Sequence, residues 1–390
     1  MFPSYIFLID ISQSSFAQGL TSTVCDSIYS VLSTFHFNER TNVSFLLFDN
    51  FLHFVKLAGK LEIVSVPSQE PWTPLPNHEI VVNLEESKEN VLNAVKEIGK
   101  IVGGPSGCIR PALETAVEVL GANGGKIFLF SFGGYLEGGH GKGVSLNPNT
   151  EFFVNLAEKM VKNNVCCDVF ASGIAHIGLV NLLPICNKTG GEAFYYRDLS
   201  LHNIDELCLD IYKTLCQPLG WEALLKLRTN RDFRISSISG HFTCKNDVLL
   251  VPALGNHTFT YELLPVHEIS SSTFLYLQFS ILYTNTEGIR LIRVFNHRVP
   301  LTNSASLIIQ GINQDCLLNF CLKQAVNIMI KRDMLIAGQK YLKFRFNDLK
   351  SACNELLGKW PENLQSFQEH MHSLTHSTLF IHTILPCKYN

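Results

Sequence analysis

The chain has 390 residues, of which 46% are apolar and 17% charged, and its formal net charge is −3. This composition is typical of a folded globular chain and excludes an intrinsically disordered one. The apolar runs are far shorter than the roughly 20 residues that a membrane helix needs, and no signal peptide pattern opens the chain. Two or three domains are expected at this length.

Charge is distributed unevenly along the chain. Residues 1–218 have fourteen Lys and Arg against twenty-two Asp and Glu, whereas residues 219–390 have seventeen against twelve. An acidic front and a basic rear suit different partners, although a chance division of solvated charge explains the counts equally well. The twelve Cys are scattered among apolar residues, which is typical of reduced core thiols in a cytosolic protein.

Residues 1–218 predict an α/β fold. The stretch Ser4 to Asp10 is continuously apolar from Tyr5 to Ile9, as in a strand buried on both faces of a parallel sheet. Strands and helices then alternate, which favours a doubly wound, mostly parallel sheet. Further strands are expected at 42–48, 51–57, 61–66, 126–132, 165–171 and 192–196. Helices are expected at 14–35, 111–120, 151–162, 176–188 and 203–216. Another helix is expected to begin after Ser87, whose hydroxyl suits the capping position. Irregular loops are expected at 67–78 and, rich in Gly, at 133–149.

The pattern changes at Pro218. Over residues 219–303, strand patterns alternate with turn signals, which predicts a β-sandwich. Its strands are expected at 222–227, 233–239, 247–251, 258–263, 274–283 and 290–296. Residues 304–390 return to a helical period over 305–357 and as a helical pair over 363–385, so we expect a helical domain, incomplete at its end. The fold class is therefore a multi-domain arrangement of α/β, all-β and all-α segments.

The first strand ends in the run D-x-S-x-S, formed by Asp10, Ser12 and Ser14. One carboxylate and two hydroxyls are hard oxygen ligands suited to Mg²⁺, and the run resembles the metal site of a von Willebrand factor A domain. The rest of that site is missing, because Ile109 and Arg110 stand where Thr and Gly belong and Phe132 replaces an Asp. We therefore expect a degenerate remnant without metal. The alternative role of these oxygens is to cap the following helix.

Other chemical candidates are weaker. The pair Gly141-Lys142 lacks the spacing of a phosphate loop, no C-x-x-C occurs, and His370, His372 and His376 suit a solvated helix face. No nucleophile and base form a convincing catalytic set, so an enzyme is not expected. Six arginines of the sandwich segment are candidates for contacts with acidic peptide signals or anionic lipid, with scattered surface charge as the alternative: Arg228, Arg231, Arg234, Arg290, Arg293 and Arg298.

Several strings resemble the cargo-adaptor branch of the COPII inner coat, the Sec-twenty-four family. They include PSYIFLIDIS at 3–12, NERTNVSFLLFDNFLHFVKL at 38–57, VNLEES at 82–87, GGEAFYY at 190–196, GWEALLKLRTN at 220–230 and LQFSILYTNTEGIRLIRVFNHRVPL at 277–301. The resemblance covers about residues 1–335. It implies an A-domain-like trunk over 1–218, a β-sandwich over 219–303 and a helical domain over 304–390. The zinc finger and the gelsolin-like domain of that family have no counterpart in this sequence, so no cofactor is expected.

The resemblance implies a coat component of ER-to-Golgi transport that recruits cargo and has no catalytic activity. The trunk would pair with the sister inner-coat subunit, and further partners would be cargo export signals, the anionic ER membrane and, indirectly, the small coat GTPase, but no nucleic acid. The expected location is cytoplasmic, peripheral on ER exit-site membranes and vesicle coats. The alternatives are a metal-dependent A-domain binding module outside the coat, and an enzyme that uses the pocket around Asp10.

Overall fold

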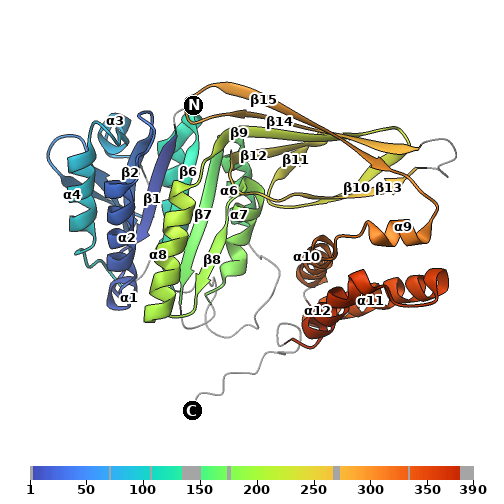
Figure 1. Cartoon of the computed structure of the whole chain (residues 1–390). Helices are drawn as coiled ribbons and strands as arrows, with labels where there is room; N and C mark the ends of the chain where they lie inside the picture. The colour runs from blue at the N-terminus through green and yellow to red at the C-terminus, as the bar shows by residue number, and fades with distance from the viewer. Residues whose placement is uncertain are drawn as a thin grey trace, which may run out of the picture.

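The computed structural model of the protein describes residues 3–69, 72–105, 108–133, 151–173, 177–266, 273–332 and 334–377. An α/β part, a pair of antiparallel sheets and a group of helices follow one another along the chain (Figure 1). The expected Gly-rich loop falls largely outside the described residues, as does the phosphate-loop candidate at 141–142.

The α/β part is built on an eight-stranded sheet of order β4-β3-β2-β1-β6-β7-β8, with β5 paired to β2. Its strands are β1 (Ser4–Asp10), β2 (Asn42–Phe48), β3 (Phe51–Lys56), β4 (Glu62–Pro67), β5 (Val82–Asn83), β6 (Gly125–Phe132), β7 (Val165–Ser172) and β8 (Ala193–Tyr196). The pairs β1–β2, β1–β6, β6–β7 and β7–β8 are parallel, whereas β3 and β4 extend the edge in antiparallel fashion. The predicted doubly wound, mostly parallel sheet is therefore confirmed.

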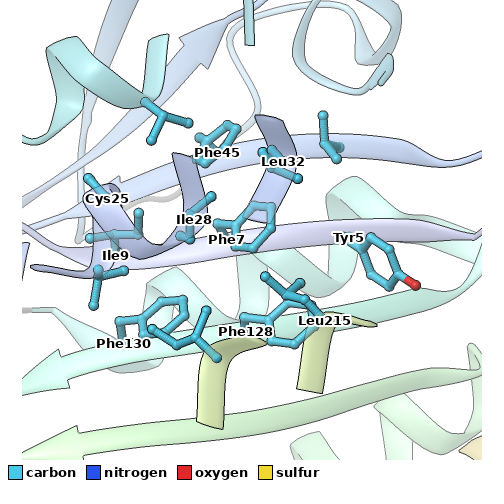
Figure 2. Close-up of a cluster of buried hydrophobic side chains, with 14 of the residues drawn as sticks. Tyr5, Phe7, Ile9, Cys25, Ile28, Leu32, Phe45, Phe128, Phe130 and Leu215 are labelled. Atoms are coloured by element: carbon cyan, nitrogen blue, oxygen red, sulfur yellow. The ribbon is translucent and has the colours of Figure 1, made fainter. Parts of the chain in front are cut away.

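Helices cover both faces of this sheet. They are α1 (Gln13–Ala17), α2 (Leu20–Thr34), α3 (Asn77–Ile80), α4 (Lys88–Ile98), α5 (Ile109–Leu120), α6 (Glu151–Lys162), α7 (Leu183–Thr189) and α8 (Leu201–Cys216). Successive side chains of a strand point to opposite faces. In β1, Phe7 belongs to the core under α2, α4 and α8, whereas Leu8 belongs to the core under α5, α6 and α7. Figure 2 shows Phe7 between Phe45 and Phe128, whose ring centroids lie 4.9 and 5.5 Å from its own.

Three helix predictions were wrong in detail. The single helix expected at 14–35 is broken at Gly19, whose φ of +79° is a left-handed conformation that glycine adopts readily. Ser87 precedes α4, but its side chain makes no capping hydrogen bond. The helix expected at 176–188 becomes a 3₁₀ turn (Leu179–Asn181) followed by the short α7. The loop expected at 67–78 also ends in the first turn of α3.

The sandwich part consists of a five-stranded sheet of order β11-β12-β9-β14-β15 and a two-stranded sheet, β10-β13. The strands are β9 (Gly220–Thr229), β10 (Phe233–Ser239), β11 (Thr243–Lys245), β12 (Val248–Leu254), β13 (Thr260–Pro265), β14 (Phe274–Thr284) and β15 (Arg290–Pro300). Its small core contains Ala223, Leu225, Leu249 and Val251. The sequence did not predict β11.

The C-terminal helices lie below the sandwich in Figure 1. They are α9 (Ala305–Gln310), α10 (Gln314–Arg332), α11 (Leu335–Leu357) and α12 (Gln365–Thr375), with a 3₁₀ turn at Glu362–Leu364. A separate core that includes Leu342, Phe367 and Met371 holds them together. Any second helix of the pair expected at 363–385 would fall beyond residue 377, outside the described residues.

A set of polar contacts joins the sandwich to the end of α7. His241 Nδ1 lies 2.8 Å from the Gly191 carbonyl oxygen, and His257 Nε2 lies 2.6 Å from that of Gly190. The hydroxyl of Thr243 donates to the Lys188 carbonyl oxygen at 3.0 Å. These side chains satisfy the carbonyl groups of Lys188, in the last turn of α7, and of Gly190 and Gly191, at and just beyond its end. Among the residues that the structure describes, no helix combines the length and apolar composition needed to cross a bilayer.

Candidate functional site

Asp10 stands at the carboxyl end of β1 and is 1% exposed. Its Oδ1 accepts the Ser12 N–H at 2.9 Å, and its Oδ2 accepts the Phe132 N–H at 3.0 Å and the Ser131 hydroxyl at 3.2 Å. Burial raises the pKa of Asp10 above its ordinary value, and the hydrogen bonds from Ser12, Phe132 and Ser131 only partly oppose that shift. Both carboxylate oxygens are therefore engaged by the protein itself.

The two serines of the D-x-S-x-S run have different environments. Ser12 is buried and caps α1, because its hydroxyl accepts the Ser15 N–H at 3.4 Å, as the capping alternative predicts. Ser14 is exposed on α1. The buried position is taken by Ser15, whose hydroxyl donates to the Asp10 carbonyl oxygen at 2.8 Å, and Thr21 donates to the same oxygen at 3.1 Å. The run therefore organises the turn between β1 and α2.

The positions that would complete a metal site lie at the start of α5 and the end of β6. Ile109 and Arg110 begin α5, and the Arg110 guanidinium lies over the rings of Phe152 and Phe153, 4.8 and 5.6 Å from their centroids. Phe132 is the last residue of β6 and contributes only its backbone N–H to Asp10. Within the described ranges, no three His, Cys, Asp or Glu side chains gather as ligands of one ion. The remnant character of this site stays a prediction.

Asp49 is a second buried carboxylate. It follows β2 directly and so lies, like Asp10, where a strand of the sheet reaches its carboxyl end. Its Oδ1 accepts the Phe51 N–H at 2.7 Å and lies 2.9 Å from His53 Nε2, while its Oδ2 accepts the Gly104 N–H at 2.6 Å. Burial opposes the ionised form, but the hydrogen bonds from Gly104, Phe51 and His53 outweigh it, so the pKa of Asp49 lies below its ordinary value. Asp49 thus ties the loop after α4 to the end of β2.

The structure also brings together a Ser–His–Asp chain that the sequence did not indicate. Ser65 Oγ lies 2.7 Å from His53 Nδ1, and His53 and Ser65 face each other across β3 and β4. Hydrolase triads have the same three groups, but there the carboxylate binds Nδ1 and the serine faces Nε2, the reverse of the present order. Asp49 and His53 line a cavity of about 290 Å³ with Ile63 and Val102, whereas Ser65 is not among its lining residues. This arrangement suits bracing of the sheet edge better than nucleophilic attack.

The six sandwich arginines are not gathered at one place. Arg290, next to the hairpin turn, is 3.5 Å from Glu222 Oε2 and donates to Thr284 Oγ1 at 2.9 Å. Arg234 is exposed on the other sheet, and Arg231 is exposed in the turn between β9 and β10. Arg293 lies over the Tyr283 ring, 5.9 Å from its centroid. The grouping that the sequence suggested is therefore only partly present in the structure.

Arg228 and Arg298 do come together, across three strands. They line a groove of about 730 Å³ with Tyr276, Gln278 and Asn296. Arg228 lies opposite Gln278, and Gln278 lies opposite Asn296 in the sheet, so the groove crosses β9, β14 and β15. The Gln278 amide donates to Asn296 Oδ1 at 3.1 Å. No Asp or Glu is among the described residues that line this groove, so its charge favours an anionic ligand.

His372 and His376 have the relation expected of a helical pair. Their rings stack with centroids 4.3 Å apart, and both side chains are exposed at the end of α12, as a solvated helix face predicts. His370 is exposed on the same helix.

The sequence missed Asp49, His53 and the amide residues of the groove. Asp49 had a usable signal, because it follows a buried strand parallel to β1, and the carboxyl ends of parallel strands meet at one edge. The sequence signal for the groove was weaker: the hairpin turn after Thr284 sets the strand register that places Arg298 beside Tyr276.

Two family models match the chain in succession. The model of the Sec23/Sec24 trunk domain matches residues 1–212, and that of the Sec23/Sec24 beta-sandwich domain matches residues 220–302. Similar curated proteins include protein transport protein SEC24 B of Arabidopsis thaliana, 27% identical over 352 residues, and protein transport protein Sec24A of Homo sapiens, 24% identical over 351 residues. Each alignment covers 83% of this chain and 32% of the relative, so the chain spans about a third of the length of these relatives.

Solved structures show the same fold. The human COPII-coat protein Sec24c superposes with a TM-score of 0.85 at 20% identity, over 97% of this chain and 55% of that one. A von Willebrand factor type A protein from Catenulispora acidiphila superposes with a TM-score of 0.56 at 10% identity, over 90% of this chain and 81% of that one. Together the two family models span most of the chain, in the order trunk then sandwich that its sheets display. The chain belongs to the Sec23/Sec24 family.

Proposed function

We propose that this chain is a component of the COPII vesicle coat in ER-to-Golgi transport and that it acts by binding, without catalysis. The observation that carries the proposal is the succession of trunk and sandwich matches over residues 1–212 and 220–302. The similar curated proteins are named as protein transport proteins, and the superposed human protein is a COPII-coat protein. The chain would work at the cytoplasmic surface of ER exit membranes.

The trunk would pair with the sister inner-coat subunit. Apolar side chains are exposed on the sheet edge formed by β3 and β4 and on the neighbouring loop: Phe51 is 47% exposed, Ile63 39% and Val102 55%. Ile63 and Val102 line the cavity above Asp49, so they lie on one surface. Clustered exposed apolar residues are typical of protein-binding surfaces. We infer that this surface contributes to subunit pairing.

The sandwich would contribute to cargo recruitment. The groove of Arg228 and Arg298 offers guanidinium groups for the carboxylates of an export signal, and its amide side chains supply further hydrogen bonds. Arg293 is exposed on β15 and is the arginine best placed for anionic lipid, since Arg290 is already paired with Glu222. The small coat GTPase would be contacted only through the sister subunit.

Co-purification tests the coat assignment. The tagged chain, expressed in cells, should capture the sister inner-coat subunit from lysate at low and moderate salt. The double variant Ile63→Glu/Val102→Glu should lose this capture, whereas Ile292→Glu, at a still more exposed apolar residue of the sandwich, should retain it. If the unmodified chain captures no sister subunit under either condition, the proposed coat role is wrong.

The metal-dependent alternative has its own test. Because both oxygens of Asp10 accept hydrogen bonds from the protein, titration with Mg²⁺ or Mn²⁺ should release no binding heat. Capture of the partner should likewise be unchanged by a chelator. A stoichiometric heat that Asp10→Ala abolishes would establish the metal-dependent module instead.

A further inference from the structure

The cavity beside Asp49 combines apolar walls with one carboxylate. Its volume is about 290 Å³, at the lower limit of the ~300–1,000 Å³ typical of pockets for drug-sized ligands, so it suits one side chain or a ligand of similar size. Five apolar side chains line it: Ile11, Leu47, Ile63, Ile101 and Val102. The described lining also includes Asp49, His53 and two glycines, but neither Lys nor Arg.

The two glycines allow the backbone to lie close to the carboxylate. A Cβ at Gly103 would lie 2.5 Å from Asp49 Oδ2 and 2.7 Å from the Ile11 carbonyl oxygen. A Cβ at Gly104 would lie 3.4 Å from the same Oδ2. A side chain at Gly103 would therefore displace the carboxylate, and glycine at both positions keeps Asp49 Oδ2 free of side-chain contact from this loop.

Asp49 has one acceptor position that the protein leaves unused. An ionised carboxylate offers about four positions to donors. Three are filled, by the N–H groups of Phe51 and Gly104 and by the ring of His53. Among the described residues, the Gly104 N–H is the one donor to Oδ2, so this oxygen can accept another. Asp49 is 4% exposed and lines the cavity, so a further donor can approach it from there.

The negative charge of Asp49 also lacks a permanent cation. Its hydrogen bonds keep its pKa below the ordinary value, so the carboxylate is ionised at neutral pH. Among the described residues, the ring of His53 is the one group within ion-pair distance that can become a cation. The Ser65 hydroxyl can donate to the other ring nitrogen of His53, so a neutral ring satisfies both contacts. A ligand that is a cation and a donor would complete this site.

The single free acceptor favours an ammonium group over a guanidinium group. The planar fork of arginine gains most from two acceptors, whereas the ammonium of lysine is a compact charge on a flexible apolar stem. Such a stem packs well against apolar walls. Ile63 and Val102 line the cavity and are themselves exposed, so the cavity borders the surface proposed for subunit pairing. A buried anchor surrounded by apolar contacts that exclude water is typical of protein interfaces.

We propose that this cavity receives the side chain of a lysine from the sister inner-coat subunit. The ammonium group donates to Asp49 Oδ2, and the methylene groups pack against Ile63, Ile101 and Val102. The identity of the partner rests on the proposed function. The affinity of the cavity for an ammonium group does not.

The first test measures the cavity alone. The probe is n-butylammonium chloride, whose cation corresponds to the lysine side chain from Cβ to Nζ. The whole chain is labelled with ¹³C at the δ1 methyl groups of isoleucine, because Ile11, Ile63 and Ile101 line the cavity. Their NMR signals should shift saturably, with a dissociation constant in the millimolar range, whereas the signal of Ile292 on the sandwich should not shift. The neutral n-butanol and the n-butylguanidinium ion should each bind at least fivefold more weakly.

Variants locate the binding. Ile63→Trp enlarges a side chain of the lining and should abolish the shifts of Ile11 and Ile101, whereas Ile292→Trp, the same change on the sandwich, should leave binding within twofold. Asp49→Asn should weaken binding at least tenfold. If that variant does not fold, the comparison of n-butylammonium with n-butanol still tests the need for charge. Absence of a saturable shift, or equal binding of n-butylammonium and either of the other two probes, would overturn the proposal.

The second test connects the cavity to the partner. At about ten times its own dissociation constant, n-butylammonium should weaken binding of the sister subunit about tenfold, because the two compete for one site. Tetramethylammonium at the same concentration has the charge but no N–H and should change it less than twofold. An amine that binds the cavity without weakening subunit binding would overturn the assignment of the lysine. If the chain captures no sister subunit, the proposed function and the source of the lysine both fail, while the methyl titration still decides whether the cavity binds an ammonium group.

Discussion

Lys126 Nζ lies 2.6 Å from Asp168 Oδ2, and the two side chains are 4% and 1% exposed. Lys126 is on β6 and Asp168 is on the adjacent β7, so the ion pair joins two neighbouring strands of the central trunk sheet. Burial alone would lower the pKa of Lys126, but the attraction of Asp168 outweighs it and raises the pKa above its ordinary value. The other Asp168 oxygen accepts the Glu192 N–H at 2.9 Å, which connects the pair to the segment before β8.

Breaking this pair should cost far more than replacing it. Lys126→Met leaves an unpaired buried carboxylate and should lower the free energy of unfolding by about 3–5 kcal/mol. The double variant Lys126→Met/Asp168→Leu should recover most of that loss. Urea denaturation of both variants and the parent gives the comparison. A double variant no more stable than Lys126→Met would show that the pair holds the sheet together in a way that apolar packing cannot replace.

Asp10 should make the protein less stable as pH rises through a defined interval. Because burial raises its pKa in the folded state, the folded chain binds the proton more tightly than the unfolded chain does. Stability therefore falls between the ordinary pKa of 3.8 and the raised value, where the unfolded state ionises first. Asp10→Asn should lack this fall. Unfolding free energies measured by urea at several pH values from 4 to 7 should show the two proteins diverging, and parallel curves would contradict the prediction.

Asp49 should have the opposite pH dependence. Its hydrogen bonds hold its folded pKa below 3.8, so the stability it confers is present above that value and is lost as pH falls through the folded pKa. At neutral pH, Asp49→Ala removes three hydrogen bonds to a charged acceptor and should cost about 3 kcal/mol or more. Hydrogen exchange should show faster exchange at Gly104, whose N–H would lose its acceptor.

Ser65→Ala is the matched control for Asp49. Ser65 is exposed, and its hydroxyl bonds to the His53 nitrogen that faces away from Asp49, so removing that hydroxyl should change stability by about 0.5 kcal/mol or less. A large effect of Ser65→Ala, or a hydrolysis of activated esters that it abolishes, would show that the chain of Ser65, His53 and Asp49 does more than brace the sheet edge.

The sequence predicted features that depend on neighbouring residues along the chain. The first strand was located to the residue, because a continuous apolar run between polar flanks leaves little freedom. The departure of Ile109, Arg110 and Phe132 from a metal-site pattern can also be read from the sequence, and the remnant character of the site around Asp10 stays a prediction. The role of Asp49 did not follow, because one of its partners is the Gly104 N–H, 55 residues away. The groove of Arg228 and Arg298 depends on the register of three strands, which a residue pattern alone does not give.

Gly190 and Gly59 separate two costs of replacing a glycine. Both have φ near +78°, so alanine at either position adopts a left-handed conformation at a cost of about 1 kcal/mol. A Cβ at Gly59 would have no heavy atom within 4 Å, whereas one at Gly190 would lie 2.7 Å from Val251 Cγ1 in the sandwich core. Gly190→Ala should therefore push the sandwich away from α7 and cost about 1–3 kcal/mol more than Gly59→Ala.

Because the contact lies at the trunk–sandwich seam, Gly190→Ala should also accelerate hydrogen exchange on β12 and weaken the hydrogen bond between His257 and the Gly190 carbonyl oxygen. Thermal denaturation and hydrogen exchange, measured on Gly59→Ala and on Gly190→Ala, would test these expectations. Equal destabilisation by Gly59→Ala and Gly190→Ala would mean that the sandwich is not held against the end of α7 as the structure has it.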